Sequence, residues 1–186
     1  INITSGTVKS TITDVVSDTL KSVTVSGDKD LTVSNSIDFA ATLNGAAVDG
    51  TIDASGFTGK LDVTTTSAQT VSITGGSGND TFTMGATLTK NDVISGGDGT
   101  DTIEIAETGN RTFADHQLTG IEALDLAVTT NSLTDFDVKG LADDIEVVVR
   151  AATTDKDVTI NNLGAGQTVK VVNDAAGTKE LGDVAV

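Results

Sequence analysis

Two nine-residue segments carry the residues of this sequence that are best suited to binding chemistry. They are Gly75-Gly76-Ser77-Gly78-Asn79-Asp80-Thr81-Phe82-Thr83 and Gly96-Gly97-Asp98-Gly99-Thr100-Asp101-Thr102-Ile103-Glu104. Both read G-G-x-G-x-D-x-U-x, where U is a large apolar residue. The glycines allow a tight turn whose carbonyl oxygens face inward, and the aspartate adds a carboxylate. Ligands that are all oxygen suit a hard cation such as calcium, which takes six to eight oxygens at about 2.3–2.6 Å.

The two segments begin 21 residues apart, and the apolar residues around them repeat at the same interval. Apolar centres fall at Leu61, Val71, Phe82, Val93 and Ile103, each in a short alternating run typical of a half-buried strand. Strands this short need stacked neighbours to pair their backbones. The pattern predicts an all-β fold, a parallel β-solenoid of the β-helix or β-roll kind, with about 21 residues per coil and turns rich in Gly and Asp.

Alternating apolar runs continue outside the central coils. Upstream they cover residues 22–25 and 30–33, and downstream residues 120–126, 145–149, 158–160 and 169–171. Residues 111–118 interrupt the rhythm and are expected to form a helical turn or a loop on one coil. No low-complexity linker divides the chain, so we expect one β-solenoid domain over residues 1–186, with its binding coils at about 70–106. The chain begins at Ile1, and we expect it to be part of a larger protein.

A spacing of one coil places the two nonapeptides one above the other on the same side of the solenoid. Two stacked turns can supply the oxygens that one turn lacks, so we expect a calcium ion between them, held by the carboxylates of Asp80 and Asp101. The other candidate ligands are the turn residues Gly75, Gly76, Ser77, Gly78, Gly96, Gly97, Asp98 and Gly99. Without a cation the two carboxylates, roughly 5 Å apart, would repel each other. The alternative interpretation is that these are ordinary Gly/Asn/Asp turns that bind nothing.

Shifting the register by another coil tests how far this site extends. Downstream, Glu122 aligns with Asp101, which predicts a second and weaker site there. Upstream the carboxylate is lost, although Asp53 stands nearby as an alternative. The turn from Gly85 to Asp92 lies on the opposite side and lacks the motif, so calcium is not expected there.

The charge and composition of the chain exclude several classes of partner. It has 22 Asp and 5 Glu against 11 Lys plus Arg, which gives a formal charge of -16. So negative a surface, with few aromatic residues, repels phosphate and offers no stacking platform, and nucleic acid is not an expected partner. No apolar run approaches the roughly 18 residues of a membrane span, so membrane insertion is not expected. Because the chain has no cysteine, calcium is the first candidate for its stabiliser.

The remaining polar residues are expected to have no catalytic role. His116 is the only histidine and follows Asp115, but no Ser or Cys partner is identifiable, so it is expected on the polar surface. Asp143-Asp144 is expected to form an acidic turn before the strand at 145–149. The many T-x-T pairs would suit an ice-binding face, but Thr is also the ordinary outward residue of a β-solenoid. Nothing supplies a nucleophile with its base, so we do not expect an enzyme.

The two nonapeptides resemble the calcium-binding repeats of RTX proteins, which Gram-negative bacteria export by type I secretion. The wider chain looks like the surface-layer (S-layer) proteins and large adhesins of that group, because it is acidic, rich in Thr and free of cysteine, with segments such as 52–59 and 118–124. This resemblance implies Ca²⁺ as the cofactor, calcium-dependent folding outside the cell and, for an S-layer member, calcium-linked lattice assembly.

We therefore expect a structural segment of a secreted protein at the extracellular cell surface, most similar to an S-layer protein. Its expected partners are other copies in a surface lattice or neighbouring domains of the same protein, and cell-surface polysaccharide through regions outside this sequence. The alternatives are an RTX module of a secreted adhesin, or of a secreted hydrolase whose catalytic domain lies outside this sequence. An adhesin module would stay monomeric in calcium and present a ligand pocket, whereas an S-layer segment would form ordered arrays.

Overall fold

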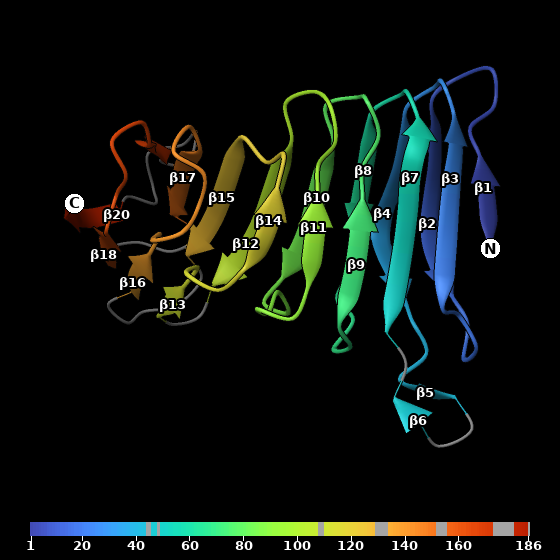
Figure 1. Ribbon diagram of the computed structural model, residues 1–186, viewed down its shortest axis with the longest axis horizontal. Coiled ribbons are helices and arrows are strands. Elements are labelled where there is room, and N and C mark those ends of the chain that lie inside the picture. Colours follow the sequence, from blue (N-terminus) through green and yellow to red (C-terminus); the bar gives the residue numbers. More distant parts are fainter. Residues whose placement is uncertain are drawn as a thin grey trace.

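The computed structural model describes residues 1–43, 46–47, 49–107, 110–128, 134–151, 156–172 and 181–185. They form a β-solenoid of parallel sheets with about seven turns of about 22 residues each. Figure 1 shows the coils stacked in chain order, from β1 at one end of the solenoid to β20 at the other. The described residues contain no helix, and therefore none that could cross a membrane. The predicted fold class is confirmed.

Two parallel sheets run along the solenoid. The first sheet contains, in spatial order, β1 (Asn2–Thr4), β3 (Ser22–Gly27), β7 (Gly50–Phe57), β9 (Val71–Thr74), β11 (Val93–Ser95) and β14 (Gln117–Thr119). The second sheet contains, in the same direction, β2 (Ser10–Val16), β4 (Leu31–Asp38), β8 (Leu61–Thr64), β10 (Thr81–Gly85), β12 (Thr102–Glu107), β15 (Ala123–Val128), β17 (Glu146–Ala151) and β19 (Thr168–Val172). Each coil up to β15 passes from the first sheet to the second, so the turns between them stack along one edge of the solenoid.

The central coils repeat at the interval that the sequence predicts. Ser72 in β9 pairs with Val93 in β11, and Phe82 in β10 pairs with Ile103 in β12, which are both separations of 21 residues. Four of the five predicted apolar centres are buried, the exception being Val93. Val93 is 41% exposed, and Ile94 fills the core in its place with 0% exposed. The assignment of Val93 to the core was wrong because two adjacent apolar residues fit the alternation equally well.

A third sheet widens the C-terminal part of the solenoid. It contains β13 (Arg111–Thr112), β16 (Thr134–Asp137), β18 (Lys156–Asn161) and β20 (Leu181–Ala185), all parallel. The segment 111–118, predicted as a helical turn or loop, instead contains β13 and the start of β14. Phe113 follows β13 and Phe136 lies in β16, and both are fully buried at 0% exposed. Burial of each phenylalanine side chain contributes about 1.5–3 kcal/mol, which holds this third face against the core.

An insertion lengthens one N-terminal coil. The register between β4 and β8 is 30 residues, because Leu31 pairs with Leu61. The extra residues include an antiparallel pair of short strands, β5 (Thr42–Leu43) and β6 (Ala46–Ala47). Figure 1 shows this hairpin projecting from the solenoid, beyond the edge that joins the second sheet back to the first. The two edges of the solenoid are therefore different, and the hairpin is not on the edge that carries the nonapeptide turns.

Candidate metal centre

The nonapeptide turns lie on what we call the glycine edge, the stack of turns at residues 58–60, 75–80, 96–101 and 120–122 between the first and second sheets. A Cβ atom added to Gly76 would lie 2.0 Å from the carbonyl oxygen of Phe57, and one added to Gly97 would lie 2.1 Å from that of Gly76. The same relation repeats at Gly78 and Gly99, where the nearest carbonyl oxygen is 2.3 Å away in each case. Glycine is required here because each turn rests directly on the backbone of its neighbour.

Backbone hydrogen bonds fix the register of these turns. The N–H of Ser77 donates to the carbonyl of Phe57 at 3.0 Å, and the N–H of Asp98 donates to that of Gly76 at 3.0 Å. The side chains of these two predicted ligands, Ser77 and Asp98, are exposed. Asn79, which the sequence reasoning passed over, adds a side-chain link, since its Oδ1 accepts the N–H of Thr100 at 3.0 Å.

One position just before each strand of the second sheet, or at its first residue, forms a row that we call the inward column. Its members on successive coils are Ser10, Leu31, Leu61, Asp80, Asp101, Glu122, Ile145 and Gln167. Asp80 is 1% exposed and Asp101 is 0% exposed, as deeply buried as the apolar members of the column. The column is therefore acidic over three successive coils, those of the nonapeptides and of the next turn, and apolar residues flank this acidic part on both sides.

Each acid of the column binds the backbone of the preceding coil. Asp80 Oδ1 accepts the N–H of Leu61 at 2.8 Å, and Asp101 Oδ1 accepts the N–H of Asp80 at 2.7 Å. Glu122 Oε2 accepts the N–H of Asp101 at 2.7 Å. One oxygen of each carboxylate thus satisfies a backbone donor that the sheet leaves unpaired. This part of the arrangement is structural and needs no ion.

The second oxygens of the two aspartates have different surroundings. Asp80 Oδ2 accepts the N–H of Gly76 at 2.9 Å. Asp101 Oδ2 is buried and has no hydrogen-bond partner. A buried carboxylate oxygen without a partner is costly, because desolvation is not offset by any hydrogen bond. The carboxylate of Asp101 is therefore the group at this edge that most needs a cation.

Burial raises the affinity of both aspartates for protons. Burial raises the pKa of Asp80, although the N–H groups of Gly76 and Leu61 act against it. Burial also raises the pKa of Asp101 to about 6, and the negative charges of Asp80, Glu122 and Asp98 add to this. A bound cation would relieve the same unfavourable interactions that the raised pKa values express.

The ligands at the glycine edge fit calcium in chemical type. No group of three or more His, Cys, Asp or Glu side chains that could hold a metal is found among the described residues. An ion here would be held by one or two carboxylates together with backbone carbonyls, a donor set of oxygens that calcium accepts. The first glycine of each motif lets these oxygens approach closely, because a Cβ on Gly75 would lie 2.0 Å from the Gly96 carbonyl oxygen and 2.7 Å from Asp80 Oδ2.

Asp53, and Asp92 on the opposite edge, have their described hydrogen bonds to nearby donors and do not resemble the acids of the glycine edge. Asp53 lies within β7, where its Oδ1 accepts the N–H and hydroxyl of Ser55 at 3.1 and 2.7 Å, so it does not belong to the glycine edge. On the opposite edge, Asp92 is 1% exposed, and its Oδ1 accepts the N–H of Val71 at 2.8 Å. Its Oδ2 accepts the N–H of Thr89 at 2.6 Å, so both oxygens are partnered. Asp92 therefore has the capping role of the column acids without an unpaired oxygen.

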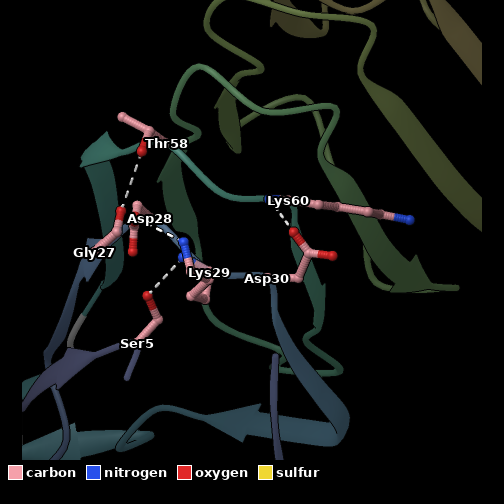
Figure 2. A network of polar contacts seen from close by, with 7 residues as sticks. All are labelled: Ser5, Gly27, Asp28, Lys29, Asp30, Thr58 and Lys60. Atoms are coloured by element: carbon pink, nitrogen blue, oxygen red, sulfur yellow. Dashed lines mark hydrogen bonds and ion pairs between the residues drawn. The ribbon is translucent and has the colours of Figure 1, made fainter. Parts of the chain in front are cut away.

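The glycine edge is built differently in the N-terminal coils. Figure 2 shows the turns after β3 and β7 joined by polar contacts. Ser5 Oγ accepts the N–H of Lys29 at 3.1 Å, and Asp30 Oδ1 accepts the N–H of Lys60 at 3.1 Å. The ammonium group of Lys29 pairs with Asp28 at 2.8 Å. In these coils, side chains of the protein make the cross-coil hydrogen bonds, and a lysine provides the positive charge. The column residues of the same coils, Leu31 and Leu61, are apolar and carry no carboxylate.

The other residues noted in the sequence lie away from this edge. His116 is half-buried with its ring centroid 5.2 Å from that of Phe113, so its assignment to the polar surface was wrong. Burial lowers the pKa of His116, and the charge of Arg111 lowers it further. Asp143 and Asp144 are exposed in the turn before β17, as predicted.

These features define a parallel β-solenoid with a stack of glycine turns over buried carboxylates. Residues 67–86 and 87–104 match the family model of the RTX calcium-binding nonapeptide repeat (4 copies). The matches contain both nonapeptide turns and cover about a fifth of the chain. RTX nonapeptide repeats bind calcium, so the cofactor is Ca²⁺, as the sequence predicts. Comparisons with curated proteins and with solved structures gave no match.

Proposed function

We propose that this chain is a calcium-stabilised structural segment of a secreted bacterial surface-layer protein. The observation that carries the proposal is the acidic part of the inward column, which coincides with the coils whose turns match a calcium-binding repeat. The proposed ligands are the carboxylates of Asp80 and Asp101 and the carbonyl oxygens of the turns 75–78 and 96–99. Calcium supplies a compact positive charge among carboxylates that otherwise repel one another.

The proposed ligands come together only in the folded chain. Asp80 and Asp101 are separated by 21 residues and meet because their coils stack. The unfolded chain therefore has no comparable site, and any calcium bound by the fold adds directly to its stability. A free concentration one hundred times the Kd adds about 2.7 kcal/mol. A chain of this kind would be weakly folded in a low-calcium cytosol and stable outside the cell.

Location and assembly belong to the same proposal. The match to an RTX repeat supports an extracellular location, because proteins with such repeats are generally secreted. The formal charge of -16 supports calcium-linked assembly, since only a few of the 27 acidic residues lie in the column. Acids on the outer surfaces of neighbouring copies would share further calcium ions, in a surface lattice or with adjoining domains of the same protein. Contacts with cell-surface polysaccharide would be made by regions outside this chain.

A thermal melt of the 186-residue chain in calcium and in chelator tests the calcium part of the proposal. We expect a higher midpoint in calcium than in chelator, and a smaller increase in magnesium, which demands a stricter octahedral geometry. An unchanged midpoint would overturn the proposal. Electron microscopy of the full-length protein tests the lattice part. Ordered two-dimensional arrays should form in calcium and disperse in chelator, and particles that stay single in calcium would favour an adhesin or an enzyme module.

A further inference from the structure

The acidic column continues one coil beyond the nonapeptide turns. Glu122 follows Gly120 and Ile121 in the short turn between β14 and β15, whereas the residues that match the repeat family end at 104. Glu122 Oε2 nevertheless accepts the N–H of Asp101 at 2.7 Å, in the way that Asp101 Oδ1 accepts the N–H of Asp80. The turn at 120–122 therefore places a carboxylate against a backbone N–H of the preceding coil, as the nonapeptide turns do, although it lacks the nonapeptide sequence.

The unpaired oxygen of Asp101 points to this additional turn. A Cβ placed on Gly96 would lie 2.2 Å from Asp101 Oδ2 and 1.9 Å from the carbonyl oxygen of Gly120. The carboxylate oxygen and the carbonyl oxygen of the next coil thus border the same small space beside a glycine. Asp101 is 0% exposed, and its Oδ2 has no hydrogen-bond partner among the residues that the structure describes.

The same pair of oxygens occurs one coil earlier. Beside Gly75, the space that a Cβ would fill is bordered by Asp80 Oδ2 at 2.7 Å and by the carbonyl oxygen of Gly96 at 2.0 Å. Asp80 and Asp101 thus each place Oδ2 beside the carbonyl of the following turn and use Oδ1 to bind the preceding coil, while Asp80 Oδ2 also accepts the N–H of Gly76. The two aspartates are equivalent members of a series and are not two halves of one clamp.

We propose that the chain binds two calcium ions, the second one between the turns 96–101 and 120–122. Asp101 Oδ2 and the Gly120 carbonyl are its ligands, and Glu122 is a positioning residue that holds the backbone N–H of Asp101. The first ion lies between the turns 75–80 and 96–101, with Asp80 Oδ2 and the Gly96 carbonyl as ligands. The next column residue, Ile145, is apolar and 1% exposed, so the series ends there. The inference rests on the proposed calcium function and adds the number of ions and the assignment of each aspartate.

Equilibrium dialysis with radioactive calcium, together with carbonyl ¹³C NMR of the same chain, tests this assignment. The wild type should bind two ions, and calcium should move the carbonyl resonances of both Gly96 and Gly120. Asp101→Asn should bind one ion and leave the Gly120 resonance unmoved, and Asp80→Asn should bind one ion and leave Gly96 unmoved. Asp62→Asn is the matched control, because it removes one charge from the outer face of β8, and it should bind two ions.

Other outcomes separate this inference from the proposed function. A wild type that binds one ion, lost in both Asp80→Asn and Asp101→Asn, would mean that both aspartates hold a single ion and would overturn the inference alone. A wild-type spectrum in which Gly96 moves and Gly120 does not would overturn it without any variant. A chain that binds no calcium would overturn the proposed function as well.

Discussion

The backbone N–H of Asp80 donates to Oδ1 of Asp101 at 2.7 Å, so the two motif aspartates are joined head to tail across adjacent coils. Their Oδ2 atoms differ, because Asp80 Oδ2 accepts the N–H of Gly76 whereas Asp101 Oδ2 is unpaired. Two residues at equivalent positions of the same motif should therefore respond in opposite ways when their charge is removed.

Asp101→Asn should stabilise the calcium-free protein at pH 7. The amide oxygen can still accept the N–H of Asp80, and the new NH₂ group replaces a buried, unpaired carboxylate oxygen beside the Gly120 carbonyl. The gain in unfolding free energy should be about 1–2 kcal/mol, measured by urea denaturation in chelator. Asp80→Asn is the matched comparison and should be destabilised by about 1 kcal/mol, because one of its two accepted N–H groups would face an amide donor. If the two substitutions change the unfolding free energy in the same direction, the prediction is contradicted.

The calcium-free protein should become more stable as the pH falls from about 6 to about 4. The pKa of Asp101 is raised to about 6 in the folded state from 3.8 for an unperturbed Asp. Between these values the folded state binds more protons than the unfolded state, so protonation favours folding. Aspartates whose pKa is lowered, such as Asp53 and Asp137, lose their contribution only at pH values below this window.

The measurement is the unfolding free energy of decalcified wild type minus that of Asp101→Asn, at several pH values. Because the other acids are common to both proteins, this difference reports the contribution of residue 101 to the pH dependence. It should rise on acidification through the window and be flat above about pH 7. In saturating calcium the wild-type trend should reverse, because protons then compete with the ion for the same carboxylates. A difference that does not vary with pH would show that Asp101 is not the buried, unpaired acid described here.

Much of this arrangement could be predicted from the sequence, because the information is local. The coil length follows from the spacing of short apolar runs, and the glycine pattern identifies turns that must stack closely. Position 93 marks the limit of such reasoning, since Val93 and Ile94 fit the alternation equally well and the pairing of Ile94 with Ile73 and Leu118 decides which is buried. The direction of each carboxylate oxygen is set by contacts between coils, which no spacing rule describes.

The third sheet was missed for a related reason. Its first two strands are short and mostly polar, and β13 contains only Arg111 and Thr112. Single buried phenylalanines, Phe113 and Phe136, anchor this part of the sheet, whereas β18 carries the alternating buried pair Val158 and Ile160 that the sequence predicts. Likewise, the apolar residues Leu31, Leu61 and Ile145 look like ordinary core positions until the strand register places them in one column with Asp80 and Asp101. The strand register is therefore needed to see how many coils the acidic part of the inward column spans.

Gly97→Ala should destabilise the protein strongly, whereas Gly56→Ala should not. Gly97 has a φ of 107°, and a Cβ there would lie 2.1 Å from the carbonyl oxygen of Gly76. Both the strained backbone and the contact oppose a side chain, so the loss of unfolding free energy should exceed about 2 kcal/mol. Gly56 has no heavy atom within 4 Å of the corresponding point, and its substitution should change stability by less than about 0.5 kcal/mol. Urea denaturation in calcium provides the comparison, and similar losses at both positions would argue against close stacking of the turns.

Asp92→Asn should destabilise the protein to the same extent with and without calcium. Asp92 is buried like the column acids, but its Oδ1 accepts the N–H of Val71, and its Oδ2 accepts the N–H of Thr89 at 2.6 Å and its hydroxyl at 3.1 Å. Either orientation of an asparagine would set its NH₂ group against a backbone donor, at a cost of about 1–3 kcal/mol.

Denaturation of Asp92→Asn and Asp80→Asn, each in calcium and in chelator, separates capping from binding. The deficit of Asp80→Asn should grow in calcium, because that variant loses a ligand as well as a hydrogen bond. The deficit of Asp92→Asn should be unchanged, since both of its oxygens are already partnered. A deficit of Asp92→Asn that grows in calcium would place an ion at the opposite edge and remove the distinction between the two edges. If both deficits are independent of calcium, the buried acids of the glycine edge serve only to cap backbone N–H groups.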